Sequence, residues 1–230
     1  MKDTPTTAID LSHHLQRSIL LQLRQNGIQT YQQLKPDGVE GNAYNYHLRN
    51  LRQAKLISSE DKVYELTAIG HVVADSFSFN AERLVLRPHV YTHIIVTSDD
   101  KVLLYNPTRQ PLPGIHCFPS GKMHYGDSYT ESIEREMHRR DLTNEYTEAF
   151  ICAINIRYKK GDDIILQRPG TVWHIDYKGP LNESTTPSGS AKWWNIDDVD
   201  TIPDITPEVA IVLSRLKEKS HDPIELSATL

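Results

Sequence analysis

Apolar side chains near the N-terminus recur with the period of an α-helix. They predict a first helix with a buried stripe made of Leu15, Ile19, Leu20 and Leu23. Gly27 follows this stripe, where a C-cap glycine is expected to end a helix. Residues 30 and 33, threonine and glutamine, have the spacing of a capping box and predict a short second helix.

A third helix is expected from about residue 41 to residue 54, with one apolar and one polar side. The apolar side carries Tyr44, Leu48, Leu51 and Lys55. The polar side carries amides, a phenol and guanidinium groups but no acid, and consists of Asn42, Asn45, Tyr46, Arg49, Arg52 and Gln53. Alternation over residues 56–66 then predicts a two-stranded hairpin. A closing helix is expected to pack through Ile69, Val72, Val73 and Phe77.

From about residue 88 the pattern changes to short β runs with two long helical stretches among them. Strands are expected at residues 89–97, 101–106, 150–158, 163–167 and 172–179. Helices are expected from Ser128 to about Asp141 and from Pro207 to Lys219, the second capped by Thr206. This mixture predicts an α/β (α+β) domain in which a mixed sheet lies between helices. The expected division is a first domain at 1–79, a linker at 80–87 and a second domain at 88–230.

Composition narrows the class of protein. A chain of 230 residues that is 38% hydrophobic can form two domains, each with its own core. The net charge of −5 argues against a protein that coats nucleic acid indiscriminately, although a net value does not exclude a local basic face. No apolar run can span a bilayer and no signal-peptide pattern is present, so we expect a cytoplasmic protein without membrane association. Cys117 and Cys152 lack the spacing of a zinc site and are expected in the core.

The third helix and the hairpin resemble a known DNA-binding module. YHLRNLRQAKLI at residues 46–57, followed by KVYELTAIG at 62–70, resembles the winged helix-turn-helix of bacterial transcription regulators over about residues 11–77. The resemblance implies that the third helix enters the DNA major groove, where asparagine suits adenine and arginine suits guanine or phosphate. The expected DNA-binding residues are Asn42, Asn45, Tyr46, Arg49, Arg52 and Lys62. The alternative is a solvated face on a protein-interaction module, which the acidic Glu60 and Asp61 at the hairpin tip favour.

The segment GKMHYGDSYTESIEREMHRRDL, residues 121–142, resembles the Nudix box of hydrolases that act on nucleoside-diphosphate-linked substrates. Gly121 matches the first glycine, and Asp127 replaces the first glutamate. Arg135, Glu136 and Met137 match the arginine–glutamate–hydrophobic step. FPSG before the box and KWWNIDDV near the far end also resemble Nudix strands. The resemblance covers roughly residues 88–219 and implies a Nudix α/β/α sandwich.

The part of the box that binds metal in this family has changed. There, the glutamate that matches Glu136 and two later glutamates hold Mg²⁺, whereas here Arg139 and Arg140 stand at the later step and Leu142 replaces the last glycine. Arg139 and Arg140 are expected to share a helix face with Glu136. Where the family has three carboxylates with a total charge of −3, this chain therefore has one carboxylate and two guanidinium groups with a total charge of +1. Arginine offers no oxygen ligand, and a positive charge about 4 Å from a divalent ion costs on the order of several kcal/mol. We therefore expect neither a metal site nor catalytic residues.

The same guanidinium groups can neutralise a pyrophosphate directly. The expected ligand-binding residues are Lys122, Glu136, Arg139, Arg140 and Trp173, the tryptophan as a stacking surface for a base. Arg135 is either a further ligand contact or an ion-pair partner of Asp127. The alternative for the arginine pair is that it binds Glu136 and closes an abandoned pocket.

A DNA-reading module joined to a metal-depleted nucleotide-hydrolase module predicts a ligand-responsive transcription regulator. Its expected partners are double-stranded DNA, a second copy of the chain, and a small phosphorylated metabolite such as ADP-ribose or a sugar phosphate. This resembles the Nudix-related transcription regulators, although those usually carry the Nudix domain first. Two alternatives stay open: a Mg²⁺-dependent Nudix hydrolase that combines Glu136 with Asp176 or Glu183, and a scaffold that binds neither DNA nor nucleotide.

Overall fold

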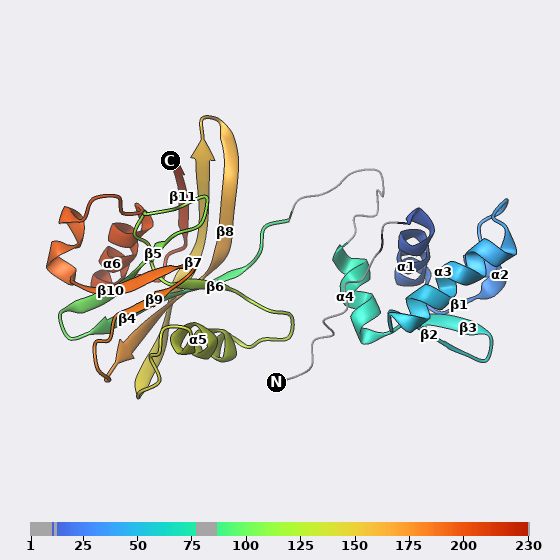
Figure 1. Ribbon diagram of the computed structural model, residues 1–230, viewed down its shortest axis with the longest axis horizontal. Coiled ribbons are helices and arrows are strands. Elements are labelled where there is room, and N and C mark those ends of the chain that lie inside the picture. The colour runs from blue at the N-terminus through green and yellow to red at the C-terminus, as the bar shows by residue number, and fades with distance from the viewer. Residues whose placement is uncertain (1–10, 12, 77–86, 230) are drawn as a thin grey trace. The chain divides into compact units, whose positions relative to one another are not determined.

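The chain divides into two compact units, Met1–Leu86 and Arg87–Leu230. The computed structural model describes residues 11, 13–76 and 87–229 (Figure 1). Of the expected linker at 80–87, only Arg87 is among the described residues, and Phe77 of the expected closing helix is not. No helix in the described ranges is both long enough and apolar enough to cross a membrane.

In the described part of the N-terminal unit, four helices combine with a small antiparallel sheet. Its elements are α1 (His14–Asn26), β1 (Gln29–Thr30), α2 (Tyr31–Leu34), α3 (Gly41–Gln53), β2 (Ile57–Glu60), β3 (Val63–Leu66) and α4 (Ala68–Ser76). The three helices, the hairpin and the final helix occur where the sequence predicts them. The two-residue strand β1 was not predicted; it pairs with β3, so the sheet has the order β1-β3-β2.

Local sequence signals account for the boundaries of these elements. Gly27 ends α1 with a φ of 72°, and Thr30 and Gln33 form the predicted capping box of α2. Asp61 and Lys62 join β2 to β3 with φ angles of 46° and 65°, as a two-residue hairpin turn requires. Buried apolar side chains from all four helices and the hairpin form one core: Ile19, Leu20, Leu23, Leu34, Tyr44, Leu48, Leu51, Leu56, Ile57, Leu66 and Ala74.

The apolar side of α3 differs from the prediction at one position. Lys55 lies beyond the end of the helix, has a φ of 57° and is exposed. His47, and not Lys55, belongs to the buried side of α3. The His47 ring stacks on the His13 ring, with the centroids 3.9 Å apart. The helical period could not predict this, because α3 ends before Lys55 and the chain there turns into the left-handed region.

The C-terminal unit is built on an eight-stranded mixed sheet. Its elements are β4 (Tyr91–Ser98), β5 (Lys101–Pro107), β6 (Ser120–Lys122), α5 (Tyr129–His138), β7 (Tyr146–Lys160), β8 (Asp163–Tyr177), β9 (Ser184–Thr186), β10 (Gly189–Asn195), a 3₁₀ helix (Ile196–Thr201), α6 (Glu208–Glu218) and β11 (Ile224–Thr229). The strand order is β11-β7-β8-β4-β5-β10-β9, and β6 pairs with β4. The β4–β8 and β7–β11 pairs are parallel, and the other pairs are antiparallel.

The predicted strand 163–167 and most of the predicted strand 172–179 form the single strand β8, which ends at Tyr177. Pro169 and Gly170 interrupt the apolar pattern between them. Gly170 pairs with Tyr91 of β4, and a Cβ at this position would lie 2.0 Å from the Tyr91 carbonyl oxygen. The glycine therefore permits a close approach of two strands and does not mark a turn.

The helices α5 and α6 cover opposite faces of the large sheet. Ile133 and Met137 of α5 pack with a buried cluster that includes Ile94, whereas Val209 and Val212 of α6 pack with a cluster that includes the next residue, Ile95. Because successive side chains of a strand point to opposite faces, this alternation produces the expected layered architecture.

One predicted cap is wrong. Pro207, and not Thr206, is the N-cap of α6, and no side chain caps this helix end. Cys117 and Cys152 are buried free thiols, as the sequence predicts.

Candidate functional site

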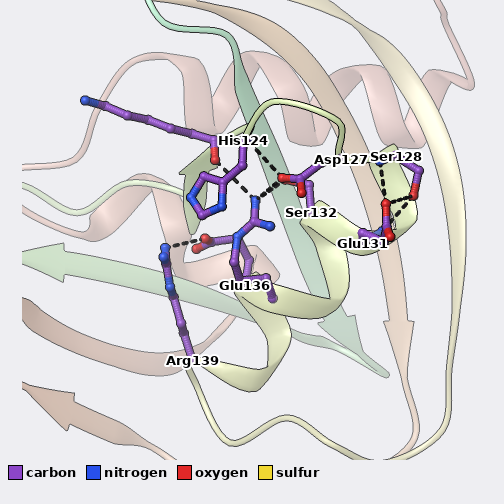
Figure 2. Close-up of polar contacts among 9 residues, drawn as sticks. His124, Asp127, Ser128, Glu131, Ser132, Glu136 and Arg139 are labelled. Atoms are coloured by element: carbon purple, nitrogen blue, oxygen red, sulfur yellow. Dashed lines mark hydrogen bonds and ion pairs between the residues drawn. The ribbon is translucent and has the colours of Figure 1, made fainter. Parts of the chain in front are cut away.

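The N-terminus of α5 is fixed by a reciprocal capping box (Figure 2). The Ser128 backbone amide donates to Glu131 Oε2 at 2.7 Å, and the Glu131 amide donates to Ser128 Oγ at 3.2 Å. Both residues were predicted in these roles. With Ile133 and Met137 buried against the sheet, the cap sets the rotation of α5 and directs Glu136 toward the first residues of β6.

A second clamp holds the loop that enters α5. Arg135 Nη2 lies 2.8 Å from Asp127 Oδ2 and also donates to the Lys122 carbonyl and to Ser132 Oγ. Asp127 Oδ2 accepts a further hydrogen bond from the His124 backbone amide at 2.8 Å (Figure 2). Partial burial acts to raise the pKa of Asp127, but the hydrogen bonds from Arg135 and His124 lower it overall. Of the two roles considered for Arg135, the structure shows the ion pair with Asp127.

Gly121 makes room for the only carboxylate on this face of α5. A Cβ built at Gly121 would lie 2.0 Å from Glu136 Oε1 and 2.4 Å from Glu136 Cδ. Any other residue would therefore displace the glutamate. The first glycine of the motif is explained by this contact, and not by a left-handed backbone.

Both oxygens of the Glu136 carboxylate are bound by arginine. Arg139 Nη1 donates to Oε1 at 2.6 Å, and Arg140 Nη1 donates to Oε2 at 2.9 Å and to the Glu136 carbonyl at 2.7 Å. The Glu136 side chain is 1% exposed and that of Arg140 is 8% exposed, whereas that of Arg139 is 55% exposed. Together, Glu136, Arg139 and Arg140 carry a net charge of +1. The Arg139 guanidinium is the most accessible of the three charged groups.

These side chains border an open cavity of about 330 Å³. The other lining residues come from β5, β6 and the β9–β10 hairpin, and most carry hydroxyl groups: Tyr105, Ser120, Ser184, Thr186, Ser188 and Gly189. Arg140 lies over the Tyr105 ring, with Cζ 5.2 Å from the centroid, and the Tyr105 hydroxyl donates to the Ser188 carbonyl at 2.7 Å. A cationic group surrounded by hydroxyls can bind an anion and the polar groups attached to it.

The β9–β10 hairpin was not predicted as part of the site. Its signal in the sequence is STTPSGS at residues 184–190, a run of hydroxyl side chains interrupted by proline and glycine. The composition predicts a loop but does not indicate which helix that loop faces.

Two of the expected ligand-binding residues lie away from the cavity. Lys122 is exposed and does not line it. Trp173 packs between Tyr129 and Phe150, with centroid distances of 5.5 and 5.6 Å, and its indole nitrogen donates to Thr171. The structure therefore brings Glu136, Arg139 and Arg140 together, but not Lys122 or Trp173.

The donor set does not fit a Nudix-type magnesium site. Magnesium requires oxygen ligands, and both oxygens of Glu136 already accept hydrogen bonds from guanidinium groups. Asp176 pairs with Lys178 at 2.8 Å, and neither Asp176 nor Glu183 lines the cavity. Within the described ranges, no group of three or more histidine, cysteine, aspartate or glutamate residues is arranged to hold a metal ion.

The expected DNA-binding residues lie in the N-terminal unit and share one property. All six are exposed: Asn42, Asn45, Tyr46, Arg49 and Arg52 on α3 and Lys62 in the β2–β3 turn. The opposite side of α3 is buried in the core. Glu60 and Asp61 are exposed beside Lys62, so the turn carries both signs of charge.

Comparison with known proteins identifies the fold of the larger unit. No family model matches the sequence, and no curated protein matches it. Among solved structures, the chain is similar to the NUDIX domain of Shewanella oneidensis NrtR complexed with ADP ribose, with a TM-score of 0.50 at 14% identity over 67% of this chain and 99% of that one. It is also similar to a MutT NUDIX hydrolase from Burkholderia pseudomallei, with a TM-score of 0.48 at 18% identity over 57% and 99% of the two chains. A UDP-X diphosphatase gives a TM-score of 0.46 at 14% identity over 80% and 83%. The similarity to the NrtR domain identifies the mixed sheet with a helix on each face as a Nudix fold.

Proposed function

We propose that this protein is a ligand-responsive, DNA-binding transcription regulator. Its Nudix unit binds a nucleotide or a phosphorylated sugar without hydrolysing it, and its N-terminal unit binds DNA as a winged helix-turn-helix. The observation that carries the proposal is the pairing of both Glu136 oxygens with Arg139 and Arg140. This pairing replaces metal coordination by a fixed cationic group.

The accessible guanidinium of Arg139 supports the binding half of this proposal. Its Nη1 atom binds Glu136, while more than half of the side chain remains exposed beside the cavity. A guanidinium has five donor hydrogens and can form paired hydrogen bonds to phosphate oxygens. The NrtR domain, which has the same fold, was solved in complex with ADP ribose. ADP-ribose and sugar phosphates are therefore the ligands to test first.

The exposed face of α3 supports the DNA-binding half. Arg49 and Arg52 lie in solvent, and amide side chains that can read base edges lie on the same face. The neighbouring hairpin has the position of a wing, immediately after the third helix. A ligand would regulate such a protein by binding more tightly to one of two arrangements of its DNA-binding units, and a coupling of about 1–3 kcal/mol is sufficient.

Ligand binding is tested by thermal unfolding of the full chain with ADP-ribose or ribose 5-phosphate. We expect an increase of several degrees in the unfolding temperature, because a ligand that binds only the native state stabilises it. Arg139→Gln should abolish the increase. Arg157→Gln, which alters a partly exposed arginine on the β7–β8 hairpin, should retain it.

Hydrolysis is tested with the same protein, a panel of nucleotide sugars, and Mg²⁺ or Mn²⁺. We expect no product. Turnover that Glu136→Gln removes would instead establish the hydrolase alternative and reject the regulator proposal for this site.

A further inference from the structure

A second cavity lies at the C-terminal end of α6, the helix that covers the sheet face opposite α5. Its volume is about 240 Å³, and none of its lining residues also lines the cavity beside Glu136. Its apolar walls come from Ala149, Phe150 and Ile151 of β7 and from Leu216 of α6. We call this space the α6 cavity. Because the two cavities share no side chain, the α6 cavity can take a ligand of its own.

An irregularity in β7 and a turn after α6 build the α6 cavity. The β7–β8 register shifts between Phe150 and Cys152, so Ile151 is an extra residue in β7. Lys219 ends α6 in the left-handed conformation, with a φ of 54°, and turns the chain back toward β7. The loop is held there because His221 Nδ1 donates to the Ile151 carbonyl at 2.6 Å. This hydrogen bond joins the two sides of the cavity, so its shape does not depend on a bound ligand.

Two parallel rings beside the apolar walls favour a flat hydrophobic ligand. Phe150 and His221 both line the cavity, with an interplanar angle of 7° and centroids 6.4 Å apart. Phe150 is 44% exposed, so its ring is accessible to a ligand. An apolar cavity of roughly 150 Å³ is enough for benzene. The α6 cavity can therefore hold one six-membered ring and a small polar group attached to it.

Two cations border the α6 cavity, and none of its described lining residues is acidic. Arg215 Nη1 donates to Ser220 Oγ at 3.0 Å and lies 3.6 Å from a carboxylate oxygen of Asp222, whose side chain is 78% exposed. Lys219 is also exposed. A cation at this helix end is favourable whatever its role, so the charge alone does not identify a site. Since Asp222 compensates Arg215, Lys219 is the cation available to an external anion at the rim of the cavity.

His174 completes the wall without adding charge at neutral pH. Its Nε2 lies 2.7 Å from Thr97 Oγ1. Burial lowers the pKa of His174, although the negative charge of Asp176 acts to raise it. The α6 cavity therefore combines apolar walls, a neutral imidazole and one available cation.

We propose that the α6 cavity binds an aromatic monocarboxylate, a flat ring that carries one carboxylate group. The ring packs against Phe150 and Leu216, and the carboxylate pairs with Lys219. A single negative charge matches the single available cation, whereas a phosphate dianion would bring an uncompensated charge against apolar walls. A neutral ring would gain no ion pair. The inference does not depend on the proposed ligand of the cavity beside Glu136 or on DNA binding.

Calorimetric titration of the full chain with benzoate tests this site. We expect one molecule bound per chain, with a dissociation constant below about 1 mM. Benzyl alcohol has the ring without the charge, and phenyl phosphate has a second negative charge. Each of these two should bind at least about tenfold more weakly than benzoate.

Two variants test the cation and the space separately. Lys219→Gln should weaken benzoate binding at least about tenfold and leave benzyl alcohol binding unchanged. Lys217→Gln is the matched control, because this lysine is exposed near the same helix end but does not line the cavity. Ala149→Phe should abolish binding of both compounds, because it fills the cavity from an exposed position. The unfolding temperature of each variant without ligand shows whether the fold is intact.

Arg139→Gln separates the two cavities. It should leave benzoate binding unchanged, and Lys219→Gln should leave the binding of ribose 5-phosphate unchanged. A dissociation constant for benzoate above about 1 mM would overturn the proposal. So would phenyl phosphate or benzyl alcohol that binds as tightly as benzoate, or benzoate binding that Lys219→Gln or Ala149→Phe leaves intact. Loss of benzoate binding in Arg139→Gln would place the compound in the cavity beside Glu136 and also reject the α6 cavity as its site.

Discussion

The arginines at the C-terminal end of α5 and those within α3 have opposite surroundings. The predicted helix to about Asp141 ends earlier, at His138, so Arg139 is the C-cap of α5 and Arg140 follows it. Both still bind Glu136, three and four residues before them. In α3, Arg49 and Arg52 lie one turn apart on a face without an acid, and both are exposed. The same residue type therefore compensates a buried charge at the end of one helix and remains available to an external anion on the face of the other. What decides the difference is the presence of Glu136.

Among substitutions that test this comparison, Glu136→Ala should change the stability of the protein most. It removes the carboxylate between two guanidiniums and leaves the buried Arg140 without its charged partner. We expect the free energy of unfolding of the Nudix unit to fall by about 3–5 kcal/mol. Urea denaturation measures this change. Glu134→Gln on the exposed flank of the same helix should change the value by less than about 0.5 kcal/mol, and equal effects of the two variants would contradict the assigned role of Glu136.

Gly121→Ala should have the next largest effect on stability. The added Cβ overlaps Glu136 Oε1 and forces the carboxylate away from its arginine partners. We expect a loss of about 1–3 kcal/mol, as for overpacking of a well-packed site. Lys122→Ala, the next residue on β6 and an exposed one, serves as the control. A crystal structure of Gly121→Ala with Glu136 unmoved would refute the explanation.

Arg49→Ala combined with Arg52→Ala tests the exposed pair. We expect about a ten- to hundredfold loss of affinity for a DNA fragment from the protein's own promoter region, measured by electrophoretic retardation. The dependence of binding on salt should also become weaker, because fewer counterions are released. Arg139→Gln, which acts in the other unit, should leave the affinity without ligand unchanged. Unaltered binding by the double variant would show that α3 does not contact DNA.

The Asp127–Arg135 pair should give the smallest effect. The pKa of Asp127 is lower in the folded protein than its ordinary value. The pair therefore stabilises the folded protein fully at pH values above the ordinary pKa of an aspartate. This stabilisation is lost as the pH falls through the lowered pKa. Because solvent screens the pair, we expect a contribution below about 1 kcal/mol. Thermal unfolding between about pH 2 and pH 6 should show a smaller pH dependence for Asp127→Asn, and an unchanged dependence would exclude the pair as its source.

Sequence patterns located the elements better than they located the cavity. The capping boxes at Thr30 and Ser128 were predicted because each depends on residues three positions apart. Trp173 was assigned to the ligand site because a nearby aromatic group can stack on a base, but its position on β8 directs it toward Phe150. Its place in the sheet depends on the pairing of strands that are distant in the chain.

The sequence by itself determined the helix and hairpin order, the capped start of α5, and the placement of Arg139 and Arg140 within reach of Glu136. These properties depend on spacings of three or four residues, which the chain fixes locally. Only the tertiary structure decided that the carboxylate is buried against Gly121, that hydroxyls of the β9–β10 hairpin complete the cavity, and that Trp173 packs between Tyr129 and Phe150. Each of these contacts joins residues that are far apart in sequence, and packing of the sheet and its helices is what brings them together.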